Sequence, residues 1–555
     1  MRFIEDFKRW RLARKGMSSG KKRRVQNDDA VIAALNRSPW VRAALYLAFC
    51  VTAAVMVMRG LGGGEEGRRA VDGAMYAFFL SISAMTVIEL NHPRVVERNG
   101  RVLLMMLGLL GQLLLVEVVG WVVQANRLPF AVALLLTPFV VGPMIHAVLL
   151  GGPAGVFSAV YASLLGTLLM DDDHKALFLC VSLISGLVAS LTLRKVRRRV
   201  QLLRAGLYSG LSALLLALVF GVIDLRTVGV GATATDWQLL GLAVGSALGV
   251  GIGTALLVSG LLPVIESTFH LTTDISWLEQ SDLNHKLLRR MQLEAPGTFH
   301  HSLVVASLAE AAAEAVGANA AMCRVCAYFH DVGKLNKPEY FIENLQEGRE
   351  NPHSALTPTM SSLIIIAHVK DGVDLALKHR LNPRVIDVIR EHHGDSLVSY
   401  FYRRAQELKR GEMEKIEKRL ENPEDLPRID EKNFRYPGPR PRSKESGIIS
   451  LADAIESASR SLKKPTPAKI RALVDDLVQA RVSDGQLDQC ELTIRDLTLV
   501  KEVFSKTLRS MLHSRIDYPK DESKKSDLES RHGRKEAIRE GIKEPVKPAE
   551  EAAGT

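Results

Sequence analysis

Several histidines and aspartates beyond Glu266 are of the types that bind divalent cations. They are His301, the adjacent pair His330 and Asp331, His368, the adjacent pair His392 and His393, and Asp453. Imidazole and carboxylate groups are the ligands expected for Mn, Fe or Zn, and one carboxylate can bridge two cations. Consecutive residues on a helix point about 100° apart, so His330 and Asp331 can serve neighbouring cations. The set therefore predicts a centre for two metal ions.

The elements that position these residues are expected to be helices. Asn382-Pro383 and Thr357-Pro358 each fit an N-cap followed by proline at the first helical position, and Gly394 stands where a helix should end. A charged connector over 265–297 is expected to end in a turn at Pro296-Gly297. Because no segment alternates convincingly between apolar and polar residues, this half is predicted to be all-α.

The first half of the chain is dominated by apolar blocks. Eight stretches approach the roughly 20 residues needed to cross hydrocarbon as a helix. They lie at about 40–59, 72–90, 102–124, 129–150, 152–170, 174–193, 201–224 and 238–264. We therefore predict five parts: a basic N-terminus (1–39), a transmembrane bundle (40–264), a juxtamembrane connector (265–297), a soluble helical domain (298–519) and a disordered charged tail (520–555).

The net charge of +11 comes from basic residues whose positions suit a membrane surface better than stable nucleic-acid binding. Basic residues cluster before the first apolar block, from Lys21 to Arg24, and between the sixth and seventh blocks, from Arg194 to Arg204. Asp171 to Asp173 fall on the opposite side. With an even number of spans, the positive-inside rule places both termini in the cytoplasm of a protein in the cell membrane. No cleavable signal is evident, so the first block is expected to stay as an anchor.

Three features of the sequence leave alternatives open. Gly241, Gly245, Gly249 and Gly253 share one helix face, which fits a homodimer seam or, more commonly, packing inside the bundle. Glu117 and His146 are ionisable groups inside spans, so they are candidates for ligand or proton sites or for polar contacts between helices. Cys323 and Cys326 form a CxxC that nothing nearby completes as a zinc site, so core packing is expected, and the five cysteines indicate reduced thiols.

The segment from Leu293 to Pro519 resembles the HD domain of the seven-transmembrane HD family of membrane-bound cyclic di-AMP phosphodiesterases. The matching strings are EAPGTFHHS (294–302), AYFHDVGKLNKPEYF (327–341), HSALTP (353–358), EHHGDSLVSYFY (391–402), FRYPGPRPRSKESGI (434–448), LADAIESASRS (451–461) and HSRIDYP (513–519). The resemblance implies that the seven residues named above are the metal ligands, with Asp331 as the bridge. It leaves His300 as a residue that supports a ligand or the fold without binding metal itself, and Val332 stands where the family usually has isoleucine.

One departure from the family lies outside these motifs. The family typically has an anchor helix, a large extracellular domain and then seven helices, whereas about a dozen residues join the first two spans here. A stimulus is therefore expected to act through the membrane bundle, the N-terminal segment or the cytoplasm.

The resemblance implies hydrolysis of cyclic di-AMP to linear pApA by a hydroxide that two divalent cations, Mn or Fe, activate. Asp331 and Lys334 are the catalytic candidates, and Lys334 is expected either to neutralise a phosphate oxygen or to be a solvated lysine. The candidates for contact with the cyclic dinucleotide are Tyr400, Tyr402, Arg435 and Tyr436, although packing explains each as well. The rivals are an HD phosphohydrolase for another nucleotide or phosphoester and a membrane receptor with a non-catalytic HD domain. No GYP motif follows, which disfavours cyclic di-GMP chemistry.

Overall fold

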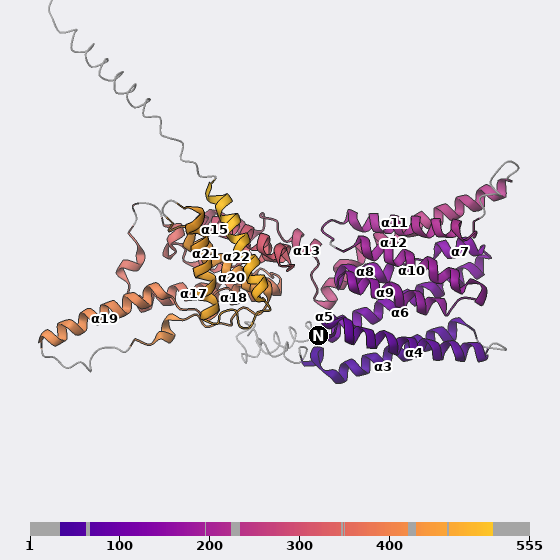
Figure 1. Ribbon diagram of the computed structural model, residues 1–555, viewed down its shortest axis with the longest axis horizontal. Helices are drawn as coiled ribbons and strands as arrows, with labels where there is room; N and C mark the ends of the chain where they lie inside the picture. The colour runs from indigo at the N-terminus through magenta and orange to yellow at the C-terminus, as the bar shows by residue number, and fades with distance from the viewer. Residues whose placement is uncertain are drawn as a thin grey trace, which may run out of the picture. The chain divides into compact units, whose positions relative to one another are not determined.

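The computed structural model describes residues 34–62, 67–194, 196–223, 233–345, 348, 350–419, 429–462 and 465–513. The basic residues Lys21 to Arg24, Lys195 and the tail at 520–555 lie outside this range. The chain divides into two compact units, Met1–Asp282 and Leu283–Thr555 (Figure 1). Helices make up nearly all of the regular structure, and the described residues contain one isolated β-bridge, between Leu397 and Arg435. The all-α fold class is thus confirmed.

The first unit is a bundle of apolar helices. Its elements are α3 (Pro39–Gly60), α4 (Gly67–Asn91), α5 (Pro93–Val96), α6 (Asn99–Asn126), α7 (Phe130–Leu136), α8 (Val141–Leu149), α9 (Gly152–Thr167), η1 (Asp172–His174), α10 (Lys175–Thr192), α11 (Val200–Val219), α12 (Ala234–Phe269) and α13 (Asp274–Glu279). Among the described residues, seven helical segments are long and apolar enough to cross a membrane. The expected eighth span folds as α9, whose 16 residues fall short of the roughly 20 that a perpendicular crossing needs.

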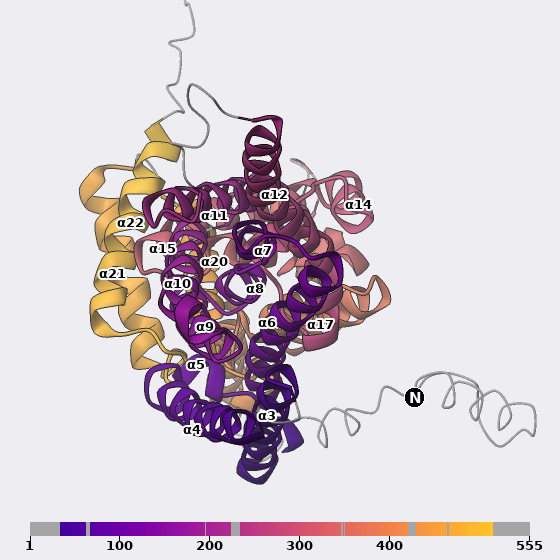
Figure 2. The same cartoon turned by 90° about the vertical axis from the view of Figure 1, so that its right-hand side faces the viewer.

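The block expected at 129–150 is a broken helix. α7 and α8 are separated at Thr137-Pro138, because proline lacks the N–H that would continue the helix. Gln112 of α6 satisfies backbone groups at the break: its Nε2 donates to Pro138 O at 2.8 Å, and its Oε1 accepts from Gly142 N at 3.2 Å. Such internal partners are required at membrane depth. α8 itself lies among α6, α9, α10 and α12, in the middle of the bundle (Figure 2).

Small residues allow α11 and α12 to approach closely. A Cβ on Gly206 would lie 2.2 Å from Gly251 O, and one on Gly210 would lie 2.4 Å from Ala247 O. The stripe of four glycines predicted from the sequence lies on another face of α12. A Cβ at Gly241, Gly245, Gly249 or Gly253 would meet nothing within 4 Å. The expectation that the stripe packs inside the bundle is therefore wrong, and the homodimer stays a prediction.

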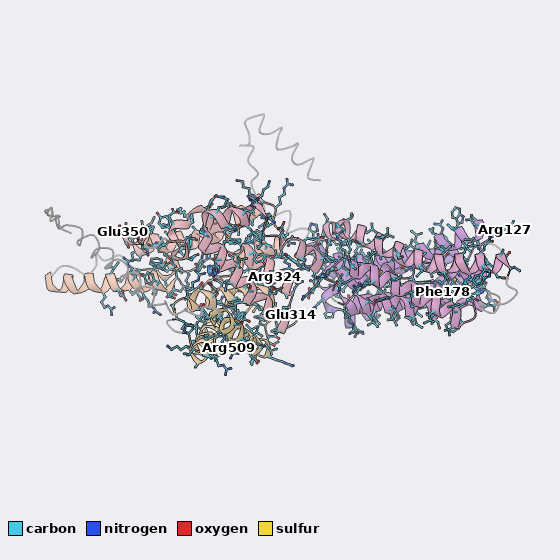
Figure 3. All side chains as sticks on the ribbon, turned by 90° about the horizontal axis from the view of Figure 1, so that it is seen from above. Arg127, Phe178, Glu314, Arg324, Glu350 and Arg509 are labelled. Carbon is cyan, nitrogen blue, oxygen red and sulfur yellow. The ribbon has the colours of Figure 1, made fainter. Side chains whose placement is uncertain are left out.

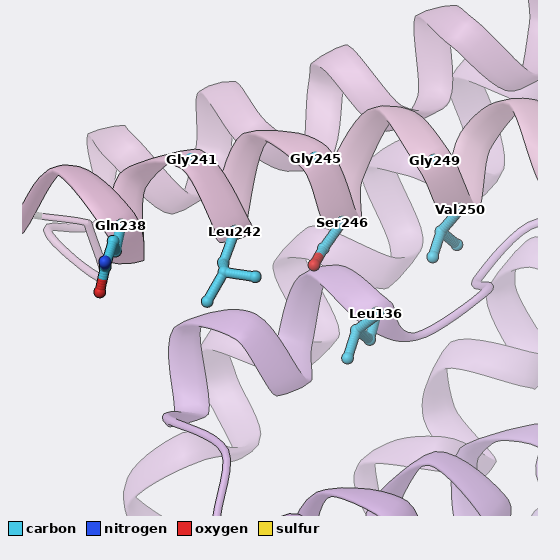
Figure 4. A pocket seen from close by; sticks show the side chains of 8 residues that line it. All are labelled: Leu136, Gln238, Gly241, Leu242, Gly245, Ser246, Gly249 and Val250. Atoms are coloured by element: carbon cyan, nitrogen blue, oxygen red, sulfur yellow. The ribbon is translucent and has the colours of Figure 1, made fainter. Parts of the chain in front are cut away.

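A groove of about 690 Å³ runs beside this stripe, between α12 and the end of α7. Figure 4 shows Leu242, Ser246 and Val250 on the side of α12 that faces Leu136.

The ionisable residues inside the bundle make contacts between helices. His146 of α8 is fully buried, and its Nε2 lies 3.2 Å from Leu104 O of α6. Its ring fills the space beside Gly108, where a Cβ would come within 2.2 Å of it. Glu117 of α6 lies beside Gly60 of α3. Elsewhere in the bundle, Phe178, labelled in Figure 3, meets Phe139 edge to face with 5.5 Å between ring centroids. For His146, the structure favours the polar contact between helices.

The second unit is built from helices joined by 3₁₀ turns. They are α14 (Lys286–Glu294), α15 (Pro296–Ala315), α16 (Ala320–Phe329), η3 (Val332–Asn336), η4 (Pro338–Tyr340), η5 (Ile342–Asn344), η6 (Pro352–Ala355), α17 (Pro358–Lys378), α18 (Pro383–Glu391), α19 (Ser399–Arg419), η8 (Glu431–Phe434), α20 (Lys444–Ser459), α21 (Pro467–Ser483) and α22 (Ile494–His513). The buried helix α15 packs against α16, α20 and α22. Cys323 and Cys326 are buried in α16, as core packing requires.

The predicted caps of this unit are present, with one difference. Thr357 Oγ1 accepts from Met360 N at the start of α17, and Asn382 Oδ1 accepts from Arg384 N at the start of α18. The turn expected at Pro296-Gly297 is wrong, because Pro296 is instead the first residue of α15. Proline at that position already has the backbone φ that a helix needs.

Candidate metal centre

The structure brings all seven predicted ligands to one place. They come from five parts of the second unit: His301 from α15, His330 and Asp331 from the end of α16, His368 from α17, His392 and His393 from the end of α18, and Asp453 from α20. Their donor atoms form two groups, each with all its atoms within 4.8 Å of one another. One group holds Asp331, His368, His392 and His393, and the other holds His301, His330, Asp331 and Asp453. Asp331 belongs to both.

Three of the histidine rings are oriented by their own helices. The Nδ1 atoms of His330, His368 and His392 lie 2.8, 2.5 and 2.9 Å from the carbonyl oxygens three residues earlier, at Ala327, Ile365 and Ile389. A carbonyl oxygen accepts only, so each Nδ1 carries a proton and Nε2 is the ring nitrogen turned toward the other donors. This second contact fixes both the tautomer and the ring orientation, as is usual for metal-binding histidines.

Asp331 presents one oxygen to each group. Its Oδ1 lies 3.4 Å from His368 Nε2 and 3.7 Å from His392 Nε2. Its Oδ2 lies 3.4 Å from His301 Nε2 and 3.3 Å from His330 Nε2. A carboxylate with its two oxygens near two separate groups of donors could bridge two cations.

Asp453 also reaches both sides of the centre. Its Oδ1 lies 3.0 Å from His301 Nε2, whereas its Oδ2 lies 3.7 Å from His393 Nδ1. His393 turns Nδ1 toward Asp453, and its ring stacks on Tyr436 with 4.2 Å between centroids. The two carboxylates thus lie between the histidines, where they offset positive charge.

Burial and neighbouring charges perturb the pKa values of the centre in opposite directions. Burial lowers the pKa of His392 to about 3, so this ring is neutral near pH 7 and has a free nitrogen lone pair. Burial also opposes charge on His330, but Asp331 and Asp453 raise its pKa to about 9. Burial acts against ionisation of Asp331 as well, yet Lys334 and the histidines hold the pKa of its carboxyl well below the usual range. The carboxylates therefore carry negative charge that attracts cations.

Glycine allows the loop after Asp331 to lie directly on α17. A Cβ on Gly333 would come 1.8 Å from His368 O and 2.5 Å from Gly372 N, so only glycine fits. Both contacts are with backbone atoms, which cannot move without displacing the helix that carries His368. The glycine of the HDVGK string therefore sets the distance between two parts of the metal centre.

The turn after His393 is held in place by polar contacts. Gly394 has φ +57°, which ends α18 in the left-handed conformation expected from the sequence. Asp395 accepts from Arg440 Nε at 3.0 Å and from Gln486 Nε2 at 2.6 Å. Gln486 is 1% exposed, so this contact ties the turn to the segment that follows α21.

Lys334 is paired with carboxylates. Its Nζ lies 2.8 Å from Asp331 Oδ2 and donates to Glu343 Oε1 at 2.7 Å. Its side chain is only 13% exposed, so the alternative of a solvated lysine is wrong. The ammonium group is next to the centre and holds Asp331 in its orientation.

The four candidates for substrate contact lie in different surroundings. Tyr436 is buried against His393. Tyr402 packs against Phe434 with 5.5 Å between ring centroids. Arg435 donates to Glu431 at 2.7 Å and to Asp395 O at 3.1 Å. Tyr400 is 68% exposed and contacts Phe401. The geometry thus places Tyr436 beside the metal centre, and His300 is exposed and outside both groups.

Two acidic residues of the site were missed in the sequence. Glu456 is 4% exposed, and its carboxylate accepts a hydrogen bond from His301 Nδ1. It also accepts from Arg460 Nε at 2.9 Å. Its position one helical turn after Asp453 was a usable signal, because residues three apart share a helix face. Glu343, the partner of Lys334, follows a run of short turns and had no such signal.

Two parts of the chain match known families. Residues 69–273 match the family described as a 7TM receptor with intracellular HD hydrolase, and residues 298–458 match the HD domain. The chain is 36% identical over 392 residues to the cyclic-di-AMP phosphodiesterase PgpH of Bacillus subtilis (strain 168), covering 69% of this chain and 51% of the relative. It is 34% identical over 386 residues to PgpH of Listeria monocytogenes serotype 1/2a (strain 10403S), covering 70% of this chain and 50% of the relative.

A solved structure also matches part of the chain. It is the crystal structure of the L. monocytogenes PgpH HD domain in complex with cyclic-di-AMP, at 39% sequence identity and a TM-score of 0.37. The match covers 41% of this chain and 99% of that one. The chain spans about half the length of the curated relatives named above. The match at 69–273 and the HD-domain match at 298–458 follow one another in one chain, so both parts are similar to the family described as a 7TM receptor with intracellular HD hydrolase.

Proposed function

We propose that this multi-pass membrane protein is a metal-dependent phosphodiesterase that hydrolyses cyclic di-AMP to linear pApA at a centre of two divalent cations, Mn or Fe. The observation that carries the proposal is the pair of donor groups that share Asp331. Two relatives named cyclic-di-AMP phosphodiesterases match over about 70% of this chain, which supports the substrate.

The residues of the centre fit divalent cations. His330 Nε2 and Asp331 Oδ1 are buried and have no hydrogen-bond partner among the described residues. Leaving such groups unpaired costs on the order of 1–3 kcal/mol each, and a bound cation would satisfy both. The mixed imidazole and carboxylate donors suit Mn, Fe or Zn better than Mg or Ca, which favour oxygen ligands.

The chain's own residues would hold and orient the reacting groups. His301, His330 and Asp453 would hold one cation, His368, His392 and His393 the other, and Asp331 both. When bound, two such cations lower the pKa of a water and offset charge on phosphoryl oxygens. Lys334 keeps Asp331 ionised and oriented through their 2.8 Å contact. Tyr436 presents an aromatic side chain next to the centre, suited to packing against a nucleotide base.

The rival functions make different demands on the centre. A non-catalytic receptor has no need of all seven donors, yet buried contacts hold all seven close to one another in the structure. A phosphohydrolase for another phosphoester would use the same centre, so the substrate must be tested directly.

The test is a product assay on the full chain in detergent. Metal-loaded protein is incubated with cyclic di-AMP, cyclic di-GMP and a simple nucleotide, and products are separated by chromatography. We expect cyclic di-AMP to give linear pApA first, because one attack opens one of its two linkages. Chelation should stop the reaction, and Mn²⁺ or Fe²⁺ should restore it. Intact cyclic di-AMP beside cleaved cyclic di-GMP or nucleotide would contradict the substrate.

We also propose that both termini lie in the cytoplasm, with α9 as the additional crossing. Residues 69–273 match a family named for seven spans and contain six of the long segments plus α9. With α3 this gives eight crossings, an even number. A reporter fused after Pro519 should read as cytoplasmic, and one inserted near Asp172 as external. An external C-terminus would mean that α9 does not cross the membrane.

A further inference from the structure

The first unit, Met1–Asp282, is called the membrane unit below. It has a second groove, with an apolar body and a basic end. Its volume is about 630 Å³, and it runs along α9 beside the last turn of α4 and the end of α10. Its apolar lining includes Val87 of α4, Val156 and Val160 of α9, and Leu191 of α10. Along α9 it extends from Gly152 to Tyr161, about 14 Å at 1.5 Å per residue. A surface of this kind fits a hydrocarbon chain.

Polar residues gather where the helices end. Asn91, His92 and Arg194 line the groove there, and no Asp or Glu is among its lining residues. Arg194 follows α10 and is exposed, and it makes no ion pair with any residue that the structure describes. The groove thus offers a guanidinium group, suited to a phosphate, at the mouth of an apolar channel.

A second observation points to a bound molecule. Ser190 lines the groove and is fully buried, yet its Oγ has no hydrogen-bond partner among the described residues. Several serine and threonine hydroxyls in the spans donate to a carbonyl of their own helix, as Thr192 does to Val188 O at 2.7 Å on the same helix. Ser190 therefore leaves a polar atom without a partner at the end of the groove that Arg194 lines.

We propose that this groove binds one anionic phospholipid, with an acyl chain along α9 and the phosphate at Arg194. A free phosphate would leave the apolar lining uncovered, and a zwitterionic lipid would not match the uncompensated positive charge. This site is separate from the metal centre and does not depend on the proposed phosphodiesterase activity.

The test uses the full chain in mild detergent and native mass spectrometry with added phosphatidylglycerol or phosphatidylcholine. We expect one phosphatidylglycerol retained per chain, in preference to phosphatidylcholine. Arg194→Gln should lower the retention about tenfold, as expected for a lost charge-assisted contact. Arg198→Gln is the matched control, because it removes the same charge from the same end without touching the groove. Its retention should stay near that of the unmodified chain.

A second variant tests the groove rather than the charge. Val160→Trp should fill the apolar channel and lower retention of phosphatidylglycerol while Arg194 remains. Each variant is first checked for a single monodisperse peak in size-exclusion chromatography, and Arg194→Lys, which keeps the charge, replaces Arg194→Gln if that variant does not fold and should then retain part of the binding. Equal retention of both lipids, equal loss in Arg194→Gln and Arg198→Gln, or full retention in Val160→Trp would each overturn the proposal.

Discussion

The membrane unit and the second unit, Leu283–Thr555 (the HD unit), differ in the way that many of their buried polar groups are satisfied. In the membrane unit, several hydroxyl groups donate to carbonyls of their own helix, as Thr167 does to Ser163 O and Thr192 to Val188 O, beside a few contacts between helices such as that of His146. In the HD unit, buried polar groups from separate helices meet, as His301 does with Asp453 and Glu456. A local contact says nothing about which helix lies next to it. A contact between residues far apart in the chain requires both partners. Finding one ligand-type residue of the HD site in the sequence therefore predicts that the others are present.

The largest effect that this comparison predicts is at Gly333. We expect Gly333→Ala to destabilise the HD unit by about 3 kcal/mol or more, because the new Cβ would overlap His368 O at 1.8 Å and the backbone must shift. Calorimetry of the full chain would measure the loss.

Gly411→Ala on α19 is the matched control for Gly333→Ala. A Cβ there meets nothing within 4 Å, so that substitution should be neutral or stabilise by up to about 1 kcal/mol. Equal effects of the two variants would show that the close approach at Gly333 does not matter.

The next effect is at Glu456. We expect Glu456→Ala to lower metal affinity about 10–100-fold, because it removes the carboxylate that orients His301 through Nδ1. Metal titration monitored by calorimetry would measure it, and Glu456→Gln, which still offers an acceptor oxygen, should recover part of the loss. Unchanged affinity in a folded Glu456→Ala chain would show that the contact does not orient the ring.

The smallest effects compare two glycines of the membrane unit. Gly206→Ala should destabilise the bundle by about 1–3 kcal/mol, since its Cβ would lie 2.2 Å from Gly251 O. Gly245→Ala, in the stripe that meets nothing within 4 Å, should leave thermal stability in detergent nearly unchanged. If Gly245→Ala proves the more damaging, the stripe has a partner that the single chain does not show, such as a second copy.

The sequence was most informative where chemistry restricts the residue type. His330, Asp331 and His392 were identifiable because few other residues can bind a cation, and Asn382-Pro383 was identifiable because capping is local. Lys334 was placed near the centre, but its pairing with Glu343 depends on a turn whose path the sequence does not reveal. The glycine stripe of α12 was misjudged because a small residue permits close packing without showing which helix supplies it. Gly251, two residues before Gly253, is where that packing occurs.

Asp331 is the carboxylate shared by the two groups of donors, and the proposed metal centre depends on it most directly. The decisive measurement is the metal content per chain, by inductively coupled plasma mass spectrometry, of the purified full chain and of Asp331→Ala, with phosphodiesterase activity measured on the same samples. We predict two divalent cations per unmodified chain. We predict fewer in a folded Asp331→Ala chain, with activity lowered by at least about a thousandfold, or ~4 kcal/mol of barrier. A folded Asp331→Ala chain that keeps both cations and full activity would contradict the shared centre.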